Sequence, residues 1–166
     1  MDSQRALQAA GVLAILVVVT AYAFQTCVVT VPFGTDQEAA TVQVVSSDGE
    51  RLATVDARVA DTRCQRYEGL SGTESLADGA GMLFVHDGEQ QLTYVMRGMN
   101  YGLDMIFVDA DGRVTAVRSA PPPAPGEDGN DIRRSARGQY VLEVPRGYAA
   151  ANGIEPGDRI EVEYRD

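Results

Sequence analysis

Alternation of apolar and polar residues with a period of two is the feature that most constrains the fold of this chain. In RLATVDARVA, residues 51–60, the apolar side chains at every second position would share one face of a strand, namely Ala53, Val55, Ala57 and Val59. This alternation is typical of a strand with one buried face. The connection SSDGE joins this segment to TVQVV before it, and its Asp-Gly dipeptide is typical of a hairpin turn. The two segments therefore predict an antiparallel hairpin.

Further short apolar segments continue the pattern to the end of the chain, as GMLFV, LTYVMR, LDMIFVD, RVTAVRS, YVLEV and RIEVEY. Two short helices are predicted between them. Thr62 and Gln65 form a possible capping box for TRCQRYE, which Gly69 would end, and Gly153 would end RGYAAANG. We therefore expect an α+β domain, mostly antiparallel β, in which a small sheet is curled or closed into a barrel.

The chain of 166 residues divides at residue 35 into an N-terminal segment and one globular domain, residues 36–166. Residues 6–24 carry no charge, and as a helix they would be roughly 28 Å long, close to the hydrocarbon thickness of a bilayer. We expect a single-pass membrane anchor, with residues 25–35 as a tether. A signal peptide cleaved after Ala21-Tyr22-Ala23 is the alternative. Both interpretations place the domain outside the cytoplasm.

The charged residues indicate which partners to exclude. The formal net charge is −10, and all 14 basic residues are arginine. A surface of this sign repels phosphates, so we expect no nucleic-acid partner. An acid excess combined with a lack of lysine is typical of proteins from high-salt environments, in which acidic clusters are solvated surface. The sequence does not predict an oligomeric state.

The two cysteines, Cys27 and Cys64, are too few for a disulfide framework or a zinc site. Two unpaired thiols are predicted, with a bridge between them as the alternative.

A single carboxylate, Asp104, occurs in the apolar strand LDMIFVD. An isolated buried carboxylate is unfavourable unless it is paired, hydrogen-bonded or protonated. Arg97 lies across the glycine-flanked turn GMNYG and is the predicted partner. The structural interpretation is that Asp104 pairs with Arg97, or accepts backbone N–H groups of the turn, and fixes the hairpin.

The functional interpretation is that the same pair lines a pocket with Met96, Met99 and Tyr101, where the guanidinium binds a small anionic ligand. The loop over residues 120–139, rich in proline, glycine and charge, would contribute to this recognition surface. The site predicted for ligand binding therefore consists of Met96, Arg97, Met99, Tyr101 and Asp104.

Evidence for other chemistry is weak. His86, the only histidine, precedes the predicted turn HDGE, and no cluster of metal ligands accompanies it. DADG, residues 109–112, resembles the start of a calcium loop but lacks its later acidic ligands. The sequence contains no G-x-S-x-G, phosphate-loop or dinucleotide motif. We therefore expect no metal and no cofactor, and the sequence does not decide whether the protein is an enzyme.

Several blocks in one order, among them EGLSGTESLADGAGMLFV, MRGMNYGLDMIFVDADGRV and QYVLEVPRGYAAANGIEPGD, resemble the domain of unknown function 192 (DUF192) family, also called uncharacterised protein family 0127, in its haloarchaeal form. The resemblance covers residues 50–163. It implies an exported or membrane-anchored single domain with a compact, mostly β fold, and it implies no reaction. The family's central segment commonly has Trp, Asn, Thr and Pro where this chain has Val95, Gly98, Met99 and Gly102, while Met96, Arg97 and Asp104 match it.

Three hypotheses for the function follow. The first is a non-catalytic, extracytoplasmic domain that binds a small ligand or acts as an accessory module. The second is a hydrolase or transferase of unknown substrate that uses Asp104 or His86 as general base. The third is a purely structural envelope protein.

Overall fold

A computed structural model of the protein describes residues 38–165. The predicted membrane anchor, residues 6–24, and Cys27 lie outside this range. Within it, no helix has the length and apolar character that crossing a bilayer requires.

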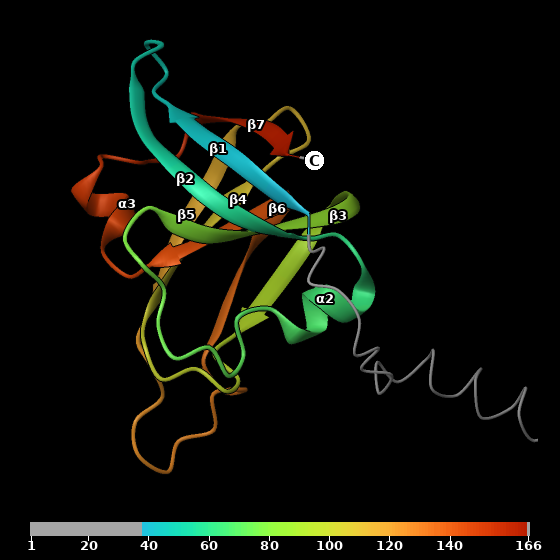
Figure 1. Cartoon of the computed structure of the whole chain (residues 1–166), viewed down its shortest axis with the longest axis vertical. Helices are drawn as coiled ribbons and strands as arrows, with labels where there is room; N and C mark the ends of the chain where they lie inside the picture. The colour runs from blue at the N-terminus through green and yellow to red at the C-terminus, as the bar shows by residue number, and fades with distance from the viewer. Residues whose placement is uncertain (1–37, 166) are drawn as a thin grey trace, which may run out of the picture. The chain divides into compact units, whose positions relative to one another are not determined.

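The described residues form one sheet of seven strands with two short helices (Figure 1). The strands follow the order β5-β4-β6-β3-β2-β1-β7 across the sheet. Their bounds are β1 (Ala39–Val45), β2 (Arg51–Ala60), β3 (Ala80–Val95), β4 (Leu103–Val108), β5 (Val114–Ala120), β6 (Arg133–Pro145) and β7 (Arg159–Arg165). The helices are α2 (Arg63–Glu68) and α3 (Tyr148–Ala151).

Neighbouring strands are antiparallel with one exception, the parallel pair of β2 and β3. The mostly antiparallel sheet and the two short helices confirm the predicted fold class. The parallel pair was not predicted; it arises because the chain passes through α2 and a long loop before β3 begins, and a crossover of this kind returns a strand in the same direction.

The sheet is not closed into a barrel, so the barrel alternative is wrong. β5 and β7 are the two ends of the strand order, and they meet only at one corner. There the backbone N–H of Val114 donates to the carbonyl of Asp158 at 2.7 Å, and that of Ile160 donates to the carbonyl of Gly112 at 2.8 Å. A single isolated bridge in this corner, between Arg113 and Arg159, does not make a ladder.

Two predictions for the residues of β3 are wrong, the division into two strands and the turn at HDGE. GMLFV and LTYVMR belong largely to one strand of 16 residues, and HDGE is a part of it rather than a turn. The register against β6 shifts between Val85 and Gln90, which marks a bulge at this place. Similarly, the predicted loop over residues 120–139 is shorter, because β6 already begins at Arg133.

Helix α2 begins with the predicted capping box, in which the Thr62 side chain accepts from the backbone N–H of Gln65 and the Gln65 side chain accepts from the backbone N–H of Thr62.

Cys64 on this helix is disulfide-bonded, so the prediction of two unpaired thiols is wrong.

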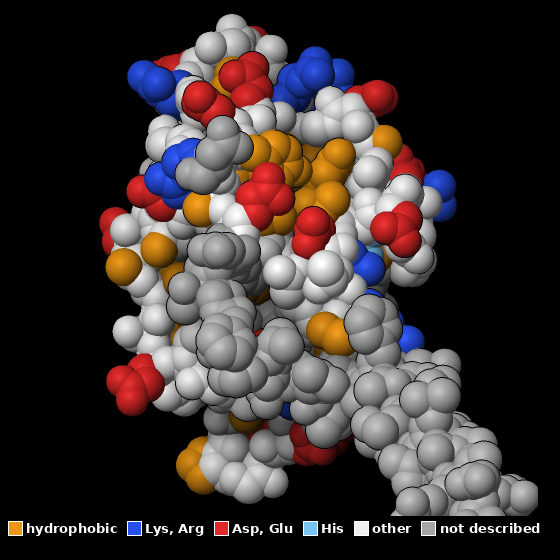
Figure 2. All heavy atoms as spheres, turned by 45° about the vertical axis from the view of Figure 1, so that its right-hand side comes forward, with side chains coloured by type: hydrophobic (Ala, Val, Ile, Leu, Met, Phe, Trp, Pro, Cys, Tyr) orange, Lys and Arg blue, Asp and Glu red, His pale blue; other side chains and the backbone are white. Residues whose placement is uncertain are grey.

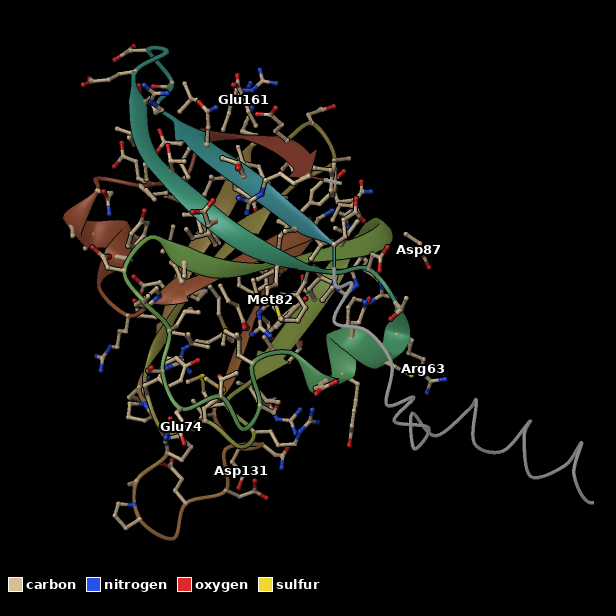
Figure 3. The ribbon with its side chains drawn as sticks, viewed as in Figure 1. Arg63, Glu74, Met82, Asp87, Asp131 and Glu161 are labelled. Carbon is tan, nitrogen blue, oxygen red and sulfur yellow. The ribbon has the colours of Figure 1, made fainter. Side chains whose placement is uncertain are left out.

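The core lies on both faces of the central strands. All six residues of β4 are buried, as the apolar run LDMIFV predicts for a strand covered on both sides. Its side chains alternate between two apolar clusters, Ile106 and Val108 in one and Met105 and Phe107 in the other. Figure 3 shows Met82 of the second cluster in the interior and Glu161 of β7 on the outside.

Candidate ligand-binding site

Asp104 is 1% exposed, and it accepts three hydrogen bonds. The hydroxyl of Ser119 donates to Oδ1 at 2.6 Å, and the backbone N–H groups of Gly147 and Ala149 donate to Oδ2 at 2.9 and 3.0 Å. Gly147 has a φ of 92° immediately before α3, a conformation that glycine adopts without strain. The carboxylate therefore fixes the start of α3 against β4 and β5.

Arg97 lies elsewhere, so the predicted pair of Arg97 with Asp104 is wrong. Its guanidinium donates to the carbonyl of Tyr67, and its central carbon lies 4.0 Å from the centroid of the Tyr67 ring. The hydroxyl of Ser71 donates to the carbonyl of Arg97 at 2.9 Å. Arg97 is therefore held by α2 and by the loop after it, not by the carboxylate of β4.

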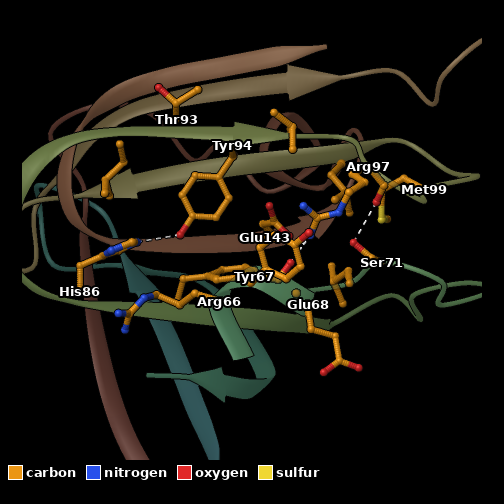
Figure 4. Close-up of a pocket in the computed structure, with 16 residues that line it drawn as sticks. Arg66, Tyr67, Glu68, Ser71, His86, Thr93, Tyr94, Arg97, Met99 and Glu143 are labelled. Carbon is orange, nitrogen blue, oxygen red and sulfur yellow. Dashed lines mark hydrogen bonds between the residues drawn. The ribbon is translucent and has the colours of Figure 1, made fainter. Parts of the chain in front are cut away.

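Arg97 contributes to the wall of a cavity of about 240 Å³ between α2 and strands β3 and β6 (Figure 4). Apolar and aromatic side chains line much of it, including Phe84, Leu92, Met99 and Leu103. Its charged and polar lining comes from Arg66, Tyr67, Glu68, Ser71, His86, Thr93, Tyr94, Arg97 and Glu143. A concave, largely apolar space with a few polar groups is the usual form of a small-molecule site.

The structure brings two of the five predicted site residues together in this cavity, Arg97 and Met99. The other three are not part of its lining. Met96 is fully buried in the core, and the hydroxyl of Tyr101 forms a hydrogen bond of 2.7 Å with that of Thr73. Asp104 is occupied by the contacts of α3.

His86 also lines the cavity, although the sequence predicted a turn residue. Its Nε2 atom and the hydroxyl of Tyr94 form a hydrogen bond of 2.9 Å across the β3 bulge. Burial lowers the pKa of His86, the nearby Arg66 lowers it further, and Asp87 partly opposes both. For Tyr94, burial instead raises the pKa, and the proximity of Glu143 raises it further.

Arg66 extends the polar wall from α2. Its Nη1 atom donates to the carbonyl of Val85 at 2.7 Å and to the carbonyl of Asp61. The contact with Val85 fixes α2 to the first half of β3, on the side of the cavity where His86 lies (Figure 4).

Glu143 is the site residue that the sequence analysis missed. It lies on central strand β6 opposite Met82 and Met105, and it is 4% exposed. Burial raises the pKa of its carboxyl to about 8. The available signal was the one that singled out Asp104: YVLEV also places one carboxylate in an apolar strand.

No group of three or more His, Cys, Asp or Glu side chains that could hold a metal ion occurs within residues 38–165.

Comparison with known proteins identifies the family. The model of the DUF192 family, described as an uncharacterised ACR, matches residues 43–162. The chain belongs to the DUF192 family. Among curated proteins the comparison finds no match.

Two solved structures are similar to this DUF192 domain. One is a protein from Sinorhizobium meliloti 1021 described as a candidate transcription regulator; it is 26% identical with a TM-score of 0.69, over 78% of this chain and 98% of the other. The second is a protein of unknown function from Novosphingobium aromaticivorans; it is 31% identical with a TM-score of 0.64, over 74% of this chain and 84% of the other. Both support the fold, and neither assigns a reaction to it.

Proposed function

We propose that this DUF192 protein is an exported, non-catalytic domain that binds a small ligand in the cavity between α2 and β3, with an anionic group of the ligand at Arg97. The position of Arg97 carries the proposal. Its guanidinium is held in one place by the carbonyl and the ring of Tyr67, and it borders a cavity of about 240 Å³.

A fixed guanidinium binds a carboxylate well because it presents several N–H donors in one plane. Within the described residues, the side chain of Arg97 makes one hydrogen bond, to Tyr67, and neither of the two ion pairs involves it. Donors therefore remain for a ligand. Because the Tyr67 contacts already order the side chain, binding a ligand requires little further loss of side-chain entropy.

The charge of the molecule favours a small ligand over a large polyanion. Acidic side chains are spread over the face shown in Figure 2, with arginines between them. A net charge of −10 repels a nucleic acid at long range, whereas a small anion inside the cavity interacts mainly with the groups that line it.

The location of the domain is part of the proposal. The uncharged segment of residues 6–24 supports a single-pass membrane anchor, or a cleaved signal peptide, with the domain outside the cytoplasm. The disulfide at Cys64 supports export, since disulfides persist mainly in oxidising compartments. The excess of acid and the absence of lysine support a haloarchaeal type. Membrane fractionation, with the mass of the mature protein, separates anchor from signal peptide.

Thermal melts of the purified protein with small carboxylates, phosphate and sugars test the binding function, because a ligand of the native state raises the melting temperature. We expect carboxylates to raise it and neutral sugars to leave it unchanged. Arg97→Ala should remove the shift. Arg63→Ala is the matched control, since Arg63 is exposed on α2 and does not line the cavity. An equal shift in the wild type and Arg97→Ala would contradict the proposal.

His86 supports a second candidate, a hydrolase or transferase. Its contact with Tyr94 on the cavity wall is the arrangement of an oriented base, whereas Asp104 is occupied by α3. Turnover of a broad panel of ester and glycoside substrates that His86→Asn abolishes would establish this candidate.

A further inference from the structure

Within the part of the chain that the structure describes, the side chain of Glu143 has no hydrogen-bond or ion-pair partner, although it is among the most buried charged side chains. Between residues 38 and 165, no hydrogen bond or ion pair to its side chain is present, whereas Asp104 in the same sheet accepts three. All fully occluded side-chain nitrogen and oxygen atoms of the described residues do have a hydrogen-bond partner. The carboxyl oxygens of Glu143 are therefore not fully occluded, and the cavity that Glu143 lines is the space that they face.

Neither of the two arginines that line the cavity pairs with Glu143. Arg66 donates to the carbonyls of Val85 and Asp61, and Arg97 is held on Tyr67. Desolvation is the cause of the raised pKa of Glu143, and neither arginine forms an ion pair with its carboxyl within residues 38–165. The described residues therefore bury an acid at the wall of a cavity without pairing it with the positive charge that would stabilise its ionised form.

A ligand can supply that charge. A primary ammonium group combines a positive charge with three N–H donors and needs no acceptor, so it satisfies a carboxylate in a confined space. Figure 4 shows Glu143 among Tyr94, Tyr67 and Arg97, so that groups of opposite charge border the same space. This cavity thus offers Glu143 as an anionic group and Arg97 as a cationic group, together with an apolar wall.

We propose that the ligand is a small amino acid, whose ammonium group binds Glu143 while its carboxylate binds Arg97. The inference rests on the proposed function for the Arg97 end and adds the Glu143 end. It defines the ligand class as zwitterionic rather than merely anionic.

Calorimetric titration of the purified full-length chain with three amino acids tests it. L-leucine, β-alanine and γ-aminobutyrate place the two charges at different separations, and leucine adds an apolar side chain. Each is compared with its N-acetyl derivative, which lacks the ammonium group, and with its amide, which lacks the carboxylate. We expect at least one free amino acid to bind, and its N-acetyl derivative to bind at least tenfold more weakly.

The outcomes separate the two ends of the site. An N-acetyl derivative that binds as tightly as its free amino acid overturns the role of Glu143 and leaves the anion site at Arg97 standing. An amide that binds as tightly as its free amino acid, when the N-acetyl derivative does not, supports Glu143 and contradicts the anion site. Failure of all three amino acids to bind overturns the inference.

Substitution provides a second, independent measurement. Glu143→Gln keeps the size of the side chain and removes its charge, so the free amino acid should bind at least tenfold more weakly while the N-acetyl derivative is unaffected. Glu161→Gln, on the exposed face of β7, is the matched control and should bind like the wild type. Equal weakening of the free and the N-acetyl forms by Glu143→Gln overturns the inference.

Discussion

The hydroxyl of Ser119 donates a hydrogen bond of 2.6 Å to Oδ1 of Asp104, and so joins β5 to β4 beneath the start of α3. The other carboxylate oxygen accepts the N–H groups of Gly147 and Ala149. One buried side chain thus satisfies three donors from two segments, β5 and the start of α3. Asp104 is a structural residue of the domain, and its contacts lie outside the cavity.

Replacement of this carboxylate should destabilise the domain. Asp104→Asn turns one acceptor into a donor, so either Ser119 or the two backbone N–H groups lose their partner. Because an unsatisfied buried polar group costs about 1–3 kcal/mol, we expect the free energy of unfolding to fall by about 2 kcal/mol or more. Ser119→Ala removes one hydrogen bond and should lower it by about 1 kcal/mol.

Urea denaturation of the two variants and the wild type measures both effects. A change in Asp104→Asn no larger than that in Ser119→Ala would show that the backbone N–H groups of α3 do not depend on the carboxylate.

The sequence predicts that Asp104 is buried and satisfied, but it does not predict which groups donate hydrogen bonds to it. An acid within an apolar strand must be buried and satisfied, so its environment can be inferred from the strand alone. Two of its actual donors are backbone N–H groups, and every residue except proline carries one, so sequence has no specific signal for them. Arg97 is the charged side chain across the nearest turn, and the alternative prediction names backbone N–H groups of that turn rather than those of Gly147 and Ala149.

The strands, like the burial of Asp104, can be predicted from local sequence, whereas their pairing cannot. Period-two alternation and helix-capping residues are local signals, so they locate most strands and both helices. The parallel contact of β2 with β3 depends on the path of the chain through α2, which alternation does not encode. The Asp-Gly dipeptide of HDGE favours a turn, yet pairing of the flanking residues with β6 keeps HDGE within β3 as a bulge.

Glu143 makes the stability of the domain depend on pH. Its pKa is raised from 4.5 to about 8 in the folded state, so between these values the folded protein holds a proton that the unfolded chain releases. The contribution of Glu143 to the free energy of unfolding is therefore fully present below pH 4.5. It declines as pH rises, by up to about 1.4 kcal/mol per pH unit, and no longer changes above pH 8.

Urea denaturation of the wild type and Glu143→Gln from pH 5 to 9 checks this dependence. Because Gln does not titrate, the stability of the wild type relative to the variant should fall with increasing pH. Glu161→Gln is the control and should follow the wild type. A difference between wild type and Glu143→Gln that does not change with pH would contradict the raised pKa.

His86 can be titrated directly by NMR, because it is the only histidine in the chain. We expect a pKa below 6.5, with burial as the largest cause. Arg66→Gln removes a nearby positive charge and should raise the pKa, whereas Asp87→Asn removes a negative charge and should lower it. Since the folded state favours neutral His86, its contribution to stability should decline as pH falls below 6.5. Equal pKa values in both variants would contradict this assignment.

The loop between β5 and β6 should control the position of Arg97 through Gly129. Its carbonyl accepts from the N–H of Met96 at 2.9 Å, and a Cβ atom on Gly129 would lie 2.1 Å from the carbonyl oxygen of Met96. Gly129→Ala therefore forces this loop away from the Met96 backbone, and we expect a destabilisation of about 1–3 kcal/mol together with weaker anion binding at Arg97. Gly88→Ala is the control, since its Cβ would meet no atom within 4 Å. Thermal melts with and without a carboxylate ligand measure both effects, and a Gly129→Ala variant that behaves like Gly88→Ala would show that the loop does not position the arginine.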